Sequence, residues 1–253
     1  MKNMDNRYTD EEILRILRER RRKKRRKKIV TRCSILVAAA LFVVFGLDKL
    51  TSGLVAKLTE EPEPYGVIFL DPGHGGVDSG TDAGGRYEKD DTLKLSLAVR
   101  DYLKEAGYTV YMSRTEDVDV DREKRGEMAN SKNADLFISF HRNQSNGEGD
   151  GAEIWLPKDN SKEAQILGRC LMDAFVECGF AERSITPGVY KNPNEDYYEN
   201  SVPKMTSCLA EVGFTSSSKD NRLFDKIDTN APIIAEAIMK THRKIFPDRY
   251  EED

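Results

Sequence analysis

The chain has 253 residues, of which 38% are hydrophobic and 33% charged, and its net charge is −4. This length allows one domain of ordinary size plus an extra segment, and the composition excludes a polytopic membrane protein, a collagen-like chain and a small disulfide-rich protein. Residues 1–32 hold 14 Lys and Arg against 5 Asp and Glu, a net charge of +9, whereas residues 33–253 hold 26 against 39, a net charge of −13. The two parts are therefore expected to have separate roles.

A polybasic stretch precedes the most apolar segment of the chain. Ten of the eleven residues from Arg18 to Lys28 are basic, and the 19 residues from Ile29 to Leu47 contain one charge, Arg32. This run is long enough to cross the hydrocarbon layer of a bilayer, about 30 Å thick, if Arg32 extends toward the headgroups. The sequence therefore predicts a transmembrane signal anchor at 29–50, preceded by a basic amphipathic segment at 1–28.

The distribution of charge around the apolar run predicts its orientation. Positive charge gathers on the N-terminal side, which favours a cytoplasmic N-terminus and places the rest of the chain outside the cytoplasmic membrane. A cleavable signal peptide is the competing explanation, but its basic region is usually short, and here 28 residues precede the apolar run without a clear cleavage site after it. Attraction to anionic headgroups explains the basic stretch, so we expect no nucleic-acid partner.

The remaining residues are typical of a spacer followed by one α/β domain. Thr59–Pro64 combines acids with two prolines, which favours an extended linker at 51–64 before a catalytic domain at 65–253. Apolar strands alternate with amphipathic helices, which predicts a mostly parallel sheet flanked by helices. In chain order, the predicted strands are Gly66–Leu70, Tyr108–Met112, Leu136–Phe140, Ala152–Leu156, a short one at Gly188–Tyr190, and Thr206–Val212. The predicted helices are Asp90–Ala106, Arg122–Lys132, Lys162–Val176 and Ala231–Phe246, the last with Pro232 in its first turn.

Two of the three histidines follow apolar strands, His74 in the segment DPGHGG and His141 in SFHRN. Open α/β sheets place ligands at the carboxyl ends of strands, and histidine is a common zinc ligand. Glu88 stands just before a helix, and Glu211 ends an apolar strand. If His74, Glu88 and His141 met, they would form a His2Glu set that leaves a fourth position for water. Glu211 would then be free to act as general base.

Each of these residues also has an ordinary structural explanation. A histidine in a loop can hydrogen-bond to the backbone, and an acid such as Glu88 in the first turn of a helix complements the helix dipole. Glu153 and the pair Glu195 and Asp196 are rival acids that nothing local distinguishes from Glu211. The residue types by themselves leave these choices open.

Four segments occur in an order and spacing that help to decide between structural and functional roles for these residues. They are IFLDPGHGGVDSGT, the EKD motif that runs from Glu88 to Leu93, a stretch with Arg114 and Arg125 that leads into ADLFISFHRN, and CLAEVGFTSS. The match runs through most of residues 66–246. In this respect the chain resembles the zinc-dependent N-acetylmuramoyl-L-alanine amidases of the amidase type 3 family.

The resemblance implies a fold, a cofactor and an activity. It implies a mixed, mostly parallel sheet flanked by helices, of the phosphorylase/hydrolase-like kind, in a single domain. It also implies that His74, Glu88 and His141 bind one Zn²⁺ and that Glu211 is the catalytic acid/base. The expected reaction is hydrolysis of the amide bond between N-acetylmuramic acid and L-alanine in peptidoglycan.

Four further residues are expected to support the ligands or to contact substrate: Asp71, Arg114, Arg142 and Asn143. The chain departs from the family pattern at Arg142, where a small residue usually follows the second histidine, and at Arg122, where a residue like Leu is usual. A cation beside the metal site would repel the ion or alter substrate contacts. This leaves a catalytically weakened protein that binds peptidoglycan as an alternative, and a zinc peptidase of related fold as a third possibility.

Overall fold

The structure is a computed structural model of the chain and describes residues 22–37, 64–145 and 149–250. Residues 1–63 and residues 64–253 form two separate compact units. The candidate site lies in the second unit.

The described part of the first unit is one helix at residues 22–37, most of whose side chains are exposed. Within the described ranges, no helix is long and apolar enough to span a membrane. The predicted anchor at 29–50 lies outside the described residues from residue 38 onward. The segment 1–21 and the linker as far as residue 63 also lie outside them, so these assignments stay predictions.

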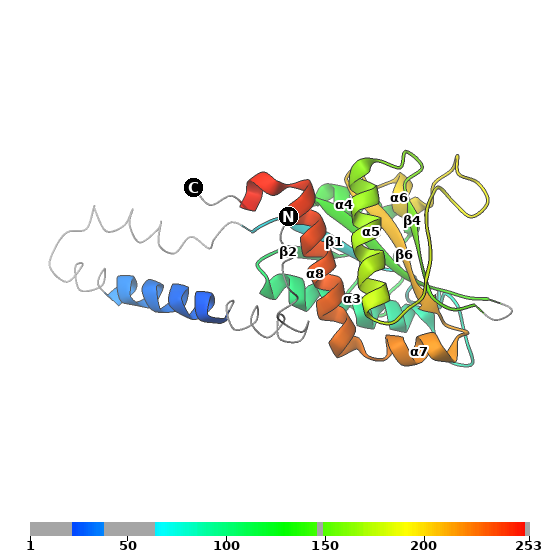
Figure 1. Ribbon diagram of the computed structural model, residues 1–253, viewed down its shortest axis with the longest axis horizontal. Helices are drawn as coiled ribbons and strands as arrows, with labels where there is room; N and C mark the ends of the chain where they lie inside the picture. Colours follow the sequence, from blue (N-terminus) through cyan, green and yellow to red (C-terminus); the bar gives the residue numbers. More distant parts are fainter. Residues whose placement is uncertain (1–21, 38–63, 146–148, 251–253) are drawn as a thin grey trace, which may run out of the picture. The chain divides into compact units, whose positions relative to one another are not determined.

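The second unit is built on a six-stranded mixed sheet (Figure 1). Its strands are β1 (Val67–Pro72), β2 (Thr109–Met112), β3 (Leu136–Asn143), β4 (Ala152–Leu156), β5 (Glu182–Pro187) and β6 (Thr206–Phe214). They lie in the order β2-β1-β3-β6-β4-β5. Neighbouring strands are parallel except β4 and β6, which are antiparallel. The mixed, mostly parallel sheet is therefore confirmed.

Helices cover both faces of this sheet. They are α3 (Glu88–Glu105), α4 (Arg122–Ser131), α5 (Lys162–Glu177), α6 (Tyr198–Ser201), α7 (Ser218–Phe224) and α8 (Ile227–Ile245), followed by a 3₁₀ turn, η1 (Pro247–Tyr250). On one face, α8 packs against both α3 and α5, and on the other α4 packs with α6 (Figure 1).

The alternation of side chains along β1 divides the core between the two faces. Ile68 and Leu70 belong to the larger apolar cluster under α3 and α8. Phe69 points the other way, and its ring stacks on that of Phe137 at a centroid distance of 5.7 Å. Strands buried on both faces have nearly continuous apolar sequences, which explains why the central strands were recognisable.

Two predicted elements were wrong in position. The strand expected at Gly188–Tyr190 lies earlier, at β5, an edge strand with polar and partly exposed side chains. Gly188 itself has a φ of +82° and begins a turn. Helix α8 begins at Ile227 and not at Ala231, so Pro232 lies in its second turn. Ile227 is buried, which favours the longer helix because the extra turn adds an apolar side chain to the core.

The third histidine has a structural role at the opposite end of β1. His242 is fully buried, and its Nε2 lies 3.1 Å from Asp135 Oδ2. Its Nδ1 contacts the hydroxyl of Tyr250. The same Asp135 oxygen accepts a hydrogen bond from the backbone N–H of Val67. This network joins the end of α8 and η1 to the start of the sheet.

Candidate metal centre

The four candidate residues of the site come from three neighbouring strands and one helix. His74 follows β1, His141 lies near the end of β3, and Glu211 lies on β6 directly opposite His141 in the register. Glu88 is the first residue of α3. Because β1, β3 and β6 are parallel neighbours, their carboxyl ends meet at the same edge of the sheet, as expected for a ligand site in an open α/β fold.

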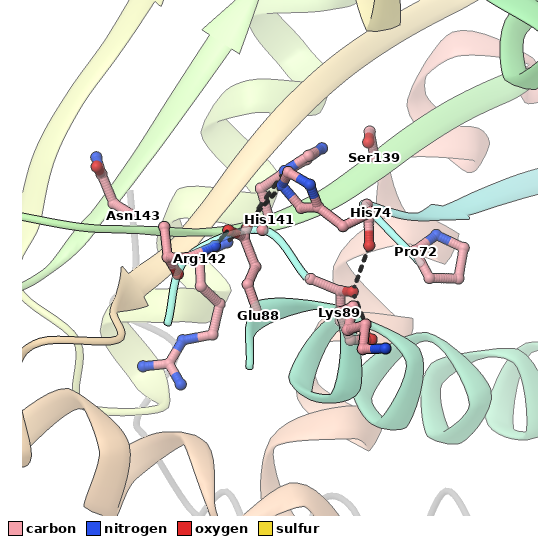
Figure 2. Close-up of polar contacts among 12 residues, drawn as sticks. Pro72, His74, Glu88, Lys89, Ser139, His141, Arg142 and Asn143 are labelled. Carbon is pink, nitrogen blue, oxygen red and sulfur yellow. Dashed lines mark hydrogen bonds and ion pairs between the residues drawn. The ribbon is translucent and has the colours of Figure 1, made fainter. Parts of the chain in front are cut away.

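His74, Glu88 and His141 converge on one point (Figure 2). Glu88 Oε1 lies 3.2 Å from His74 Nε2 and 3.0 Å from His141 Nδ1. One ligand atom from each residue lies within 4.8 Å of the others. The second nitrogen of His74, Nδ1, lies 2.9 Å from Asp78 Oδ2, a carboxylate contact of the kind that orients metal-binding histidines.

The loop after β1 is shaped to admit both imidazoles. His74 has a φ of +60°, in the left-handed region. A Cβ atom at Gly73 would lie 2.4 Å from the ring of His141, and one at Gly80 would lie 2.6 Å from the ring of His74. Only glycine permits such close approach, so these two positions keep the histidine rings in place.

Glu88 is buried and held as a carboxylate. Its Oε1 accepts a hydrogen bond from the N–H of Arg142 and its Oε2 accepts one from the N–H of Thr81, both at 2.9 Å. Burial opposes its charge, but hydrogen bonds and charge from His141 and His74 hold the pKa of Glu88 well below its ordinary 4.5. The Glu88 side chain is therefore an anion that can bind a cation.

The chemistry of the cluster fits a zinc ion. Burial opposes the charge of His141, but the carboxylate of Glu88 and the charges of Glu211 and Glu199 raise its pKa to about 9. Its buried Nε2 has no hydrogen-bond partner in the described part of the chain. Two imidazoles and one carboxylate, with positive charge favoured among them, match the three-ligand pattern of zinc hydrolases.

Glu211 faces a cavity of about 630 Å³ beside the cluster. Its Oε2 is buried without a hydrogen-bond partner among the described residues. Burial raises the pKa of Glu211 to about 8; His141 opposes this, whereas the charges of Glu88 and Glu153 add to it. A carboxyl group that is unpaired and titrates near neutral pH is suited to accept and return a proton.

The rival acids do not reach this cavity. Glu153 lies opposite Glu211 in the register of β4 and β6, but its carboxylate is bonded by Arg183 at 2.6 Å and by Asn143 at 3.1 Å. Asp196 accepts from the N–H of Lys158. Glu153, Glu195, Asp196 and the predicted contact residue Asn143 are absent from the cavity lining.

Two residues for which the sequence predicted no role at the site, Glu199 and the motif residue Arg125, also line the cavity. Glu199, on the four-residue helix α6, has a carboxylate oxygen 4.0 Å from His141 Nε2. Arg125 donates to the carbonyl oxygens of His74 and Pro72, at 2.9 and 2.8 Å. Neither role has a local sequence signal, because α6 is too short to show a period and Arg125 acts on residues 51 and 53 positions away in the chain.

Asp71 and Arg114 support the loop from behind and do not line the cavity. Asp71 is fully buried and accepts hydrogen bonds from Arg125, Ser113 and Ser139. Arg114 donates to the carbonyl oxygens of Pro72 and Gly73. Of the two expected roles for these residues, the structure favours support of the ligand loop over substrate contact.

Replacing Asp71 with asparagine is expected to destabilise the domain by roughly 3–5 kcal/mol at pH 7, because Arg125 would lose a buried partner. Burial opposes the charge of Asp71, but Arg125 and two serine hydroxyls hold its pKa below the ordinary 3.8. A depressed pKa gives stability that is present above pH 3.8 and lost as pH falls through the folded value. Urea unfolding at pH 7 and pH 3 should show the difference from wild type shrinking in acid; a constant difference would refute this account.

Arg142 does not face the metal cluster, which corrects the expectation of a substrate contact or a repelled ion. Its side chain is fully buried and points away from the histidines (Figure 2). The guanidinium pairs with Asp91, donates to Asn221 at 2.8 Å and stacks on the ring of Phe224 at 4.3 Å. The reason is strand geometry, since neighbours on a strand point to opposite faces.

Arg142 to alanine is expected to lower the free energy of unfolding by roughly 3–5 kcal/mol, because it removes one partner of a buried ion pair. Arg100 to alanine is a matched control, since its pair with Asp101 lies at the surface and such pairs contribute less than about 1 kcal/mol. Urea denaturation of both variants measures the contrast. Equal losses would show that the Arg142 network contributes no more than a surface pair.

A family model, a related sequence and a solved structure that match this chain all carry the same description, N-acetylmuramoyl-L-alanine amidase. Residues 68–241 match the family described as N-acetylmuramoyl-L-alanine amidase (Amidase_3). The uncharacterized protein YqiI of Bacillus subtilis (strain 168) is 34% identical over 160 residues, which are 63% of this chain and 75% of that protein. The sporulation-specific N-acetylmuramoyl-L-alanine amidase of the same strain is 43% identical over 156 residues, which are 60% of this chain and 58% of that protein. The crystal structure of N-acetylmuramoyl-L-alanine amidase from Clostridium difficile 630 has a TM-score of 0.63 and 26% identity, covering 75% of this chain and 100% of that one.

Proposed function

The chain belongs to the amidase type 3 family of N-acetylmuramoyl-L-alanine amidases, and from that premise we propose that it is a zinc-dependent hydrolase of peptidoglycan. The bond cleaved is the amide between N-acetylmuramic acid and L-alanine. The observation that carries this proposal is the cluster of His74, Glu88 and His141 beside an unpaired carboxyl group, Glu211, at one cavity.

Each residue has a defined part in the proposed reaction. His74, Glu88 and His141 would hold the zinc ion, which when bound polarises the scissile carbonyl group and makes a water molecule more acidic. Glu211 accepts a proton from the attacking water and then donates it to the leaving nitrogen of L-alanine, so that the amine departs neutral. Asp78 fixes the ring of His74, and Arg125 fixes the loop that carries it.

The test is product identification with the full chain on purified peptidoglycan. We expect glycan strands whose N-acetylmuramic acid units carry free carboxyl groups, and stem peptides with a free N-terminal L-alanine. Absence of these products from the zinc-loaded protein would contradict the proposal. Release of amino acids from peptides without muramic acid would favour a zinc peptidase.

The alternative of an inactive peptidoglycan-binding protein rested on Arg142. The buried position of that side chain, away from the cluster, removes the reason for expecting a weakened metal site. Binding of peptidoglycan without cleavage by the zinc-loaded chain would restore this alternative.

We also propose that the chain is a single-pass protein of the cytoplasmic membrane with its catalytic domain outside. The support is the apolar run from Ile29 to Leu47 next to the basic stretch that ends at Lys28. Added protease should digest the domain on intact protoplasts and leave a membrane-bound N-terminal fragment. Recovery of the intact chain in the soluble fraction, or protection of the domain from protease, would contradict this location.

A further inference from the structure

Among the described residues, the cavity beside the metal cluster has an acidic lining that also contains two arginines, Arg122 and Arg125. Its carboxylates include Asp119, Asp121 and Glu123, which stand close to Arg122 in the chain, and Glu199 and Glu211. The guanidinium of Arg125 is held by hydrogen bonds within the protein. Its nitrogens donate to Asp71 and to the carbonyl oxygens of Pro72, His74 and Val120. Arg122 has no hydrogen-bond or ion-pair partner among the described residues.

Among the described residues, the charge of Arg122 acts on Asp78, whose pKa it helps to lower, but no hydrogen bond or ion pair holds its guanidinium. Arg122 is the first residue of helix α4, where the helix dipole disfavours positive charge. The neighbouring Asp121 caps the helix by accepting hydrogen bonds from the N–H groups of Glu123 and Lys124, at 3.0 and 3.4 Å. Arg122 is exposed and packs in no apolar cluster of the described residues. Its guanidinium can therefore bind a chemical group of a substrate that enters the cavity.

The chemistry of the proposed substrate indicates which group Arg122 would bind. The only carboxyl group of N-acetylmuramic acid is consumed in the amide bond that is cleaved, so the glycan side brings no carboxylate. The stem peptide does carry carboxyl groups, either free or amidated. Guanidinium binds carboxylate through two parallel hydrogen bonds, whereas the surrounding acids of the cavity would repel the same group.

We propose that Arg122 binds a carboxylate of the stem peptide and makes the protein prefer substrates in which that group is free over those in which it is amidated. This inference rests on the proposed function, and it names the charge of the peptide as the feature that is selected. It makes Arg122 a specificity-determining residue of the cavity, separate from the residues that hold the metal or move the proton.

The test compares two soluble muropeptides that differ at one group, a free carboxylate or a carboxamide on the residue after L-alanine. For the full chain, Arg122→Gln is expected to lower the ratio of kcat/KM for the free over the amidated substrate about tenfold, chiefly through KM for the free one. Arg122→Lys should keep part of the preference. Lys124→Gln is the matched control, because it removes the same charge from the same helix outside the cavity lining, and its ratio should equal that of wild type.

An unchanged ratio in Arg122→Gln, or an equal change in Lys124→Gln, would overturn the inference. If the wild-type chain cleaves neither muropeptide, the proposed function fails, and calorimetric binding of both compounds to wild type and to Arg122→Gln still decides the inference. The expected result there is binding of the free carboxylate compound that Arg122→Gln weakens about tenfold relative to the amidated one. Equal affinity of the two compounds for wild type would refute it.

Discussion

Glu211→Gln is expected to lower kcat on peptidoglycan by about 10²–10⁴-fold, the usual contribution of a general acid/base. Glutamine has the same shape as glutamate but neither accepts nor returns the proton of the attacking water. KM and zinc content should stay close to those of wild type, because Glu211 is not one of the three clustered ligands. The measurement is steady-state turnover with the zinc content determined on the same samples.

The stability of this variant serves as an internal check. Burial raises the pKa of Glu211 to about 8, so in the metal-free chain its ionisation costs stability as pH rises from the ordinary 4.5 toward 8. Glutamine avoids this cost, and the metal-free variant should be at least as stable as wild type at pH 8. Lost activity therefore does not come from unfolding.

Glu153→Gln is the matched control for Glu211→Gln. The two acids face each other in the register of β4 and β6, but Glu153 is bonded by Arg183 and Asn143 and does not line the cavity. Its replacement should change kcat by less than about tenfold, since it takes no part in proton transfer. Activity of Glu211→Gln within tenfold of wild type, or equal losses in the two variants, would contradict the assigned role.

His74→Asn is expected to weaken zinc binding by more than about 100-fold, because loss of an outer partner of a ligand already costs 10–100-fold. Asparagine is the suitable replacement, since it tolerates the left-handed φ of +60° at this position. Hydrolysis should fall in proportion to zinc content and recover in part at high zinc concentration. Metal titration followed by calorimetry, together with turnover, measures both quantities.

Asp78→Asn gives a graded comparison with His74→Asn. Asp78 contacts His74 at Nδ1, the nitrogen that faces away from Glu88, and also accepts a hydrogen bond from the N–H of Gly80. Its replacement should therefore weaken zinc binding by about 10–100-fold and leave the three ligands in place. Both variants should unfold at the same temperature as wild type, within a few degrees, when all are measured with a chelator. Unchanged zinc affinity in His74→Asn would exclude the cluster as the metal site.

The central strands and the edge of the sheet that holds the site were predictable from local patterns. Strands β1, β3 and β6 each contain a mostly apolar run that leads into a polar residue in the second half of the strand. Strand β5 was misplaced because an edge strand with exposed polar side chains has no such pattern. Burial on both faces is thus the physical property that the sequence pattern reports.

The surroundings of the site were less predictable because they depend on distant pairings. Arg142 was expected near the metal because the predicted strand ended at Phe140. Strand β3 continues to Asn143, so Arg142 points to the face opposite that of His141. In contrast, the contact of Arg125 with the loop at His74 and the approach of Glu199 to His141 arise only when separate elements pack together. No spacing within either segment indicates them.

The most direct test of the account is the zinc stoichiometry of the full chain, measured by elemental analysis after dialysis against trace zinc. Wild type and Glu211→Gln are expected to hold one zinc per chain, and His74→Asn less than one tenth of that. Equal zinc content in wild type and His74→Asn, or no zinc in wild type, would contradict the assignment of His74, Glu88 and His141 as the metal centre.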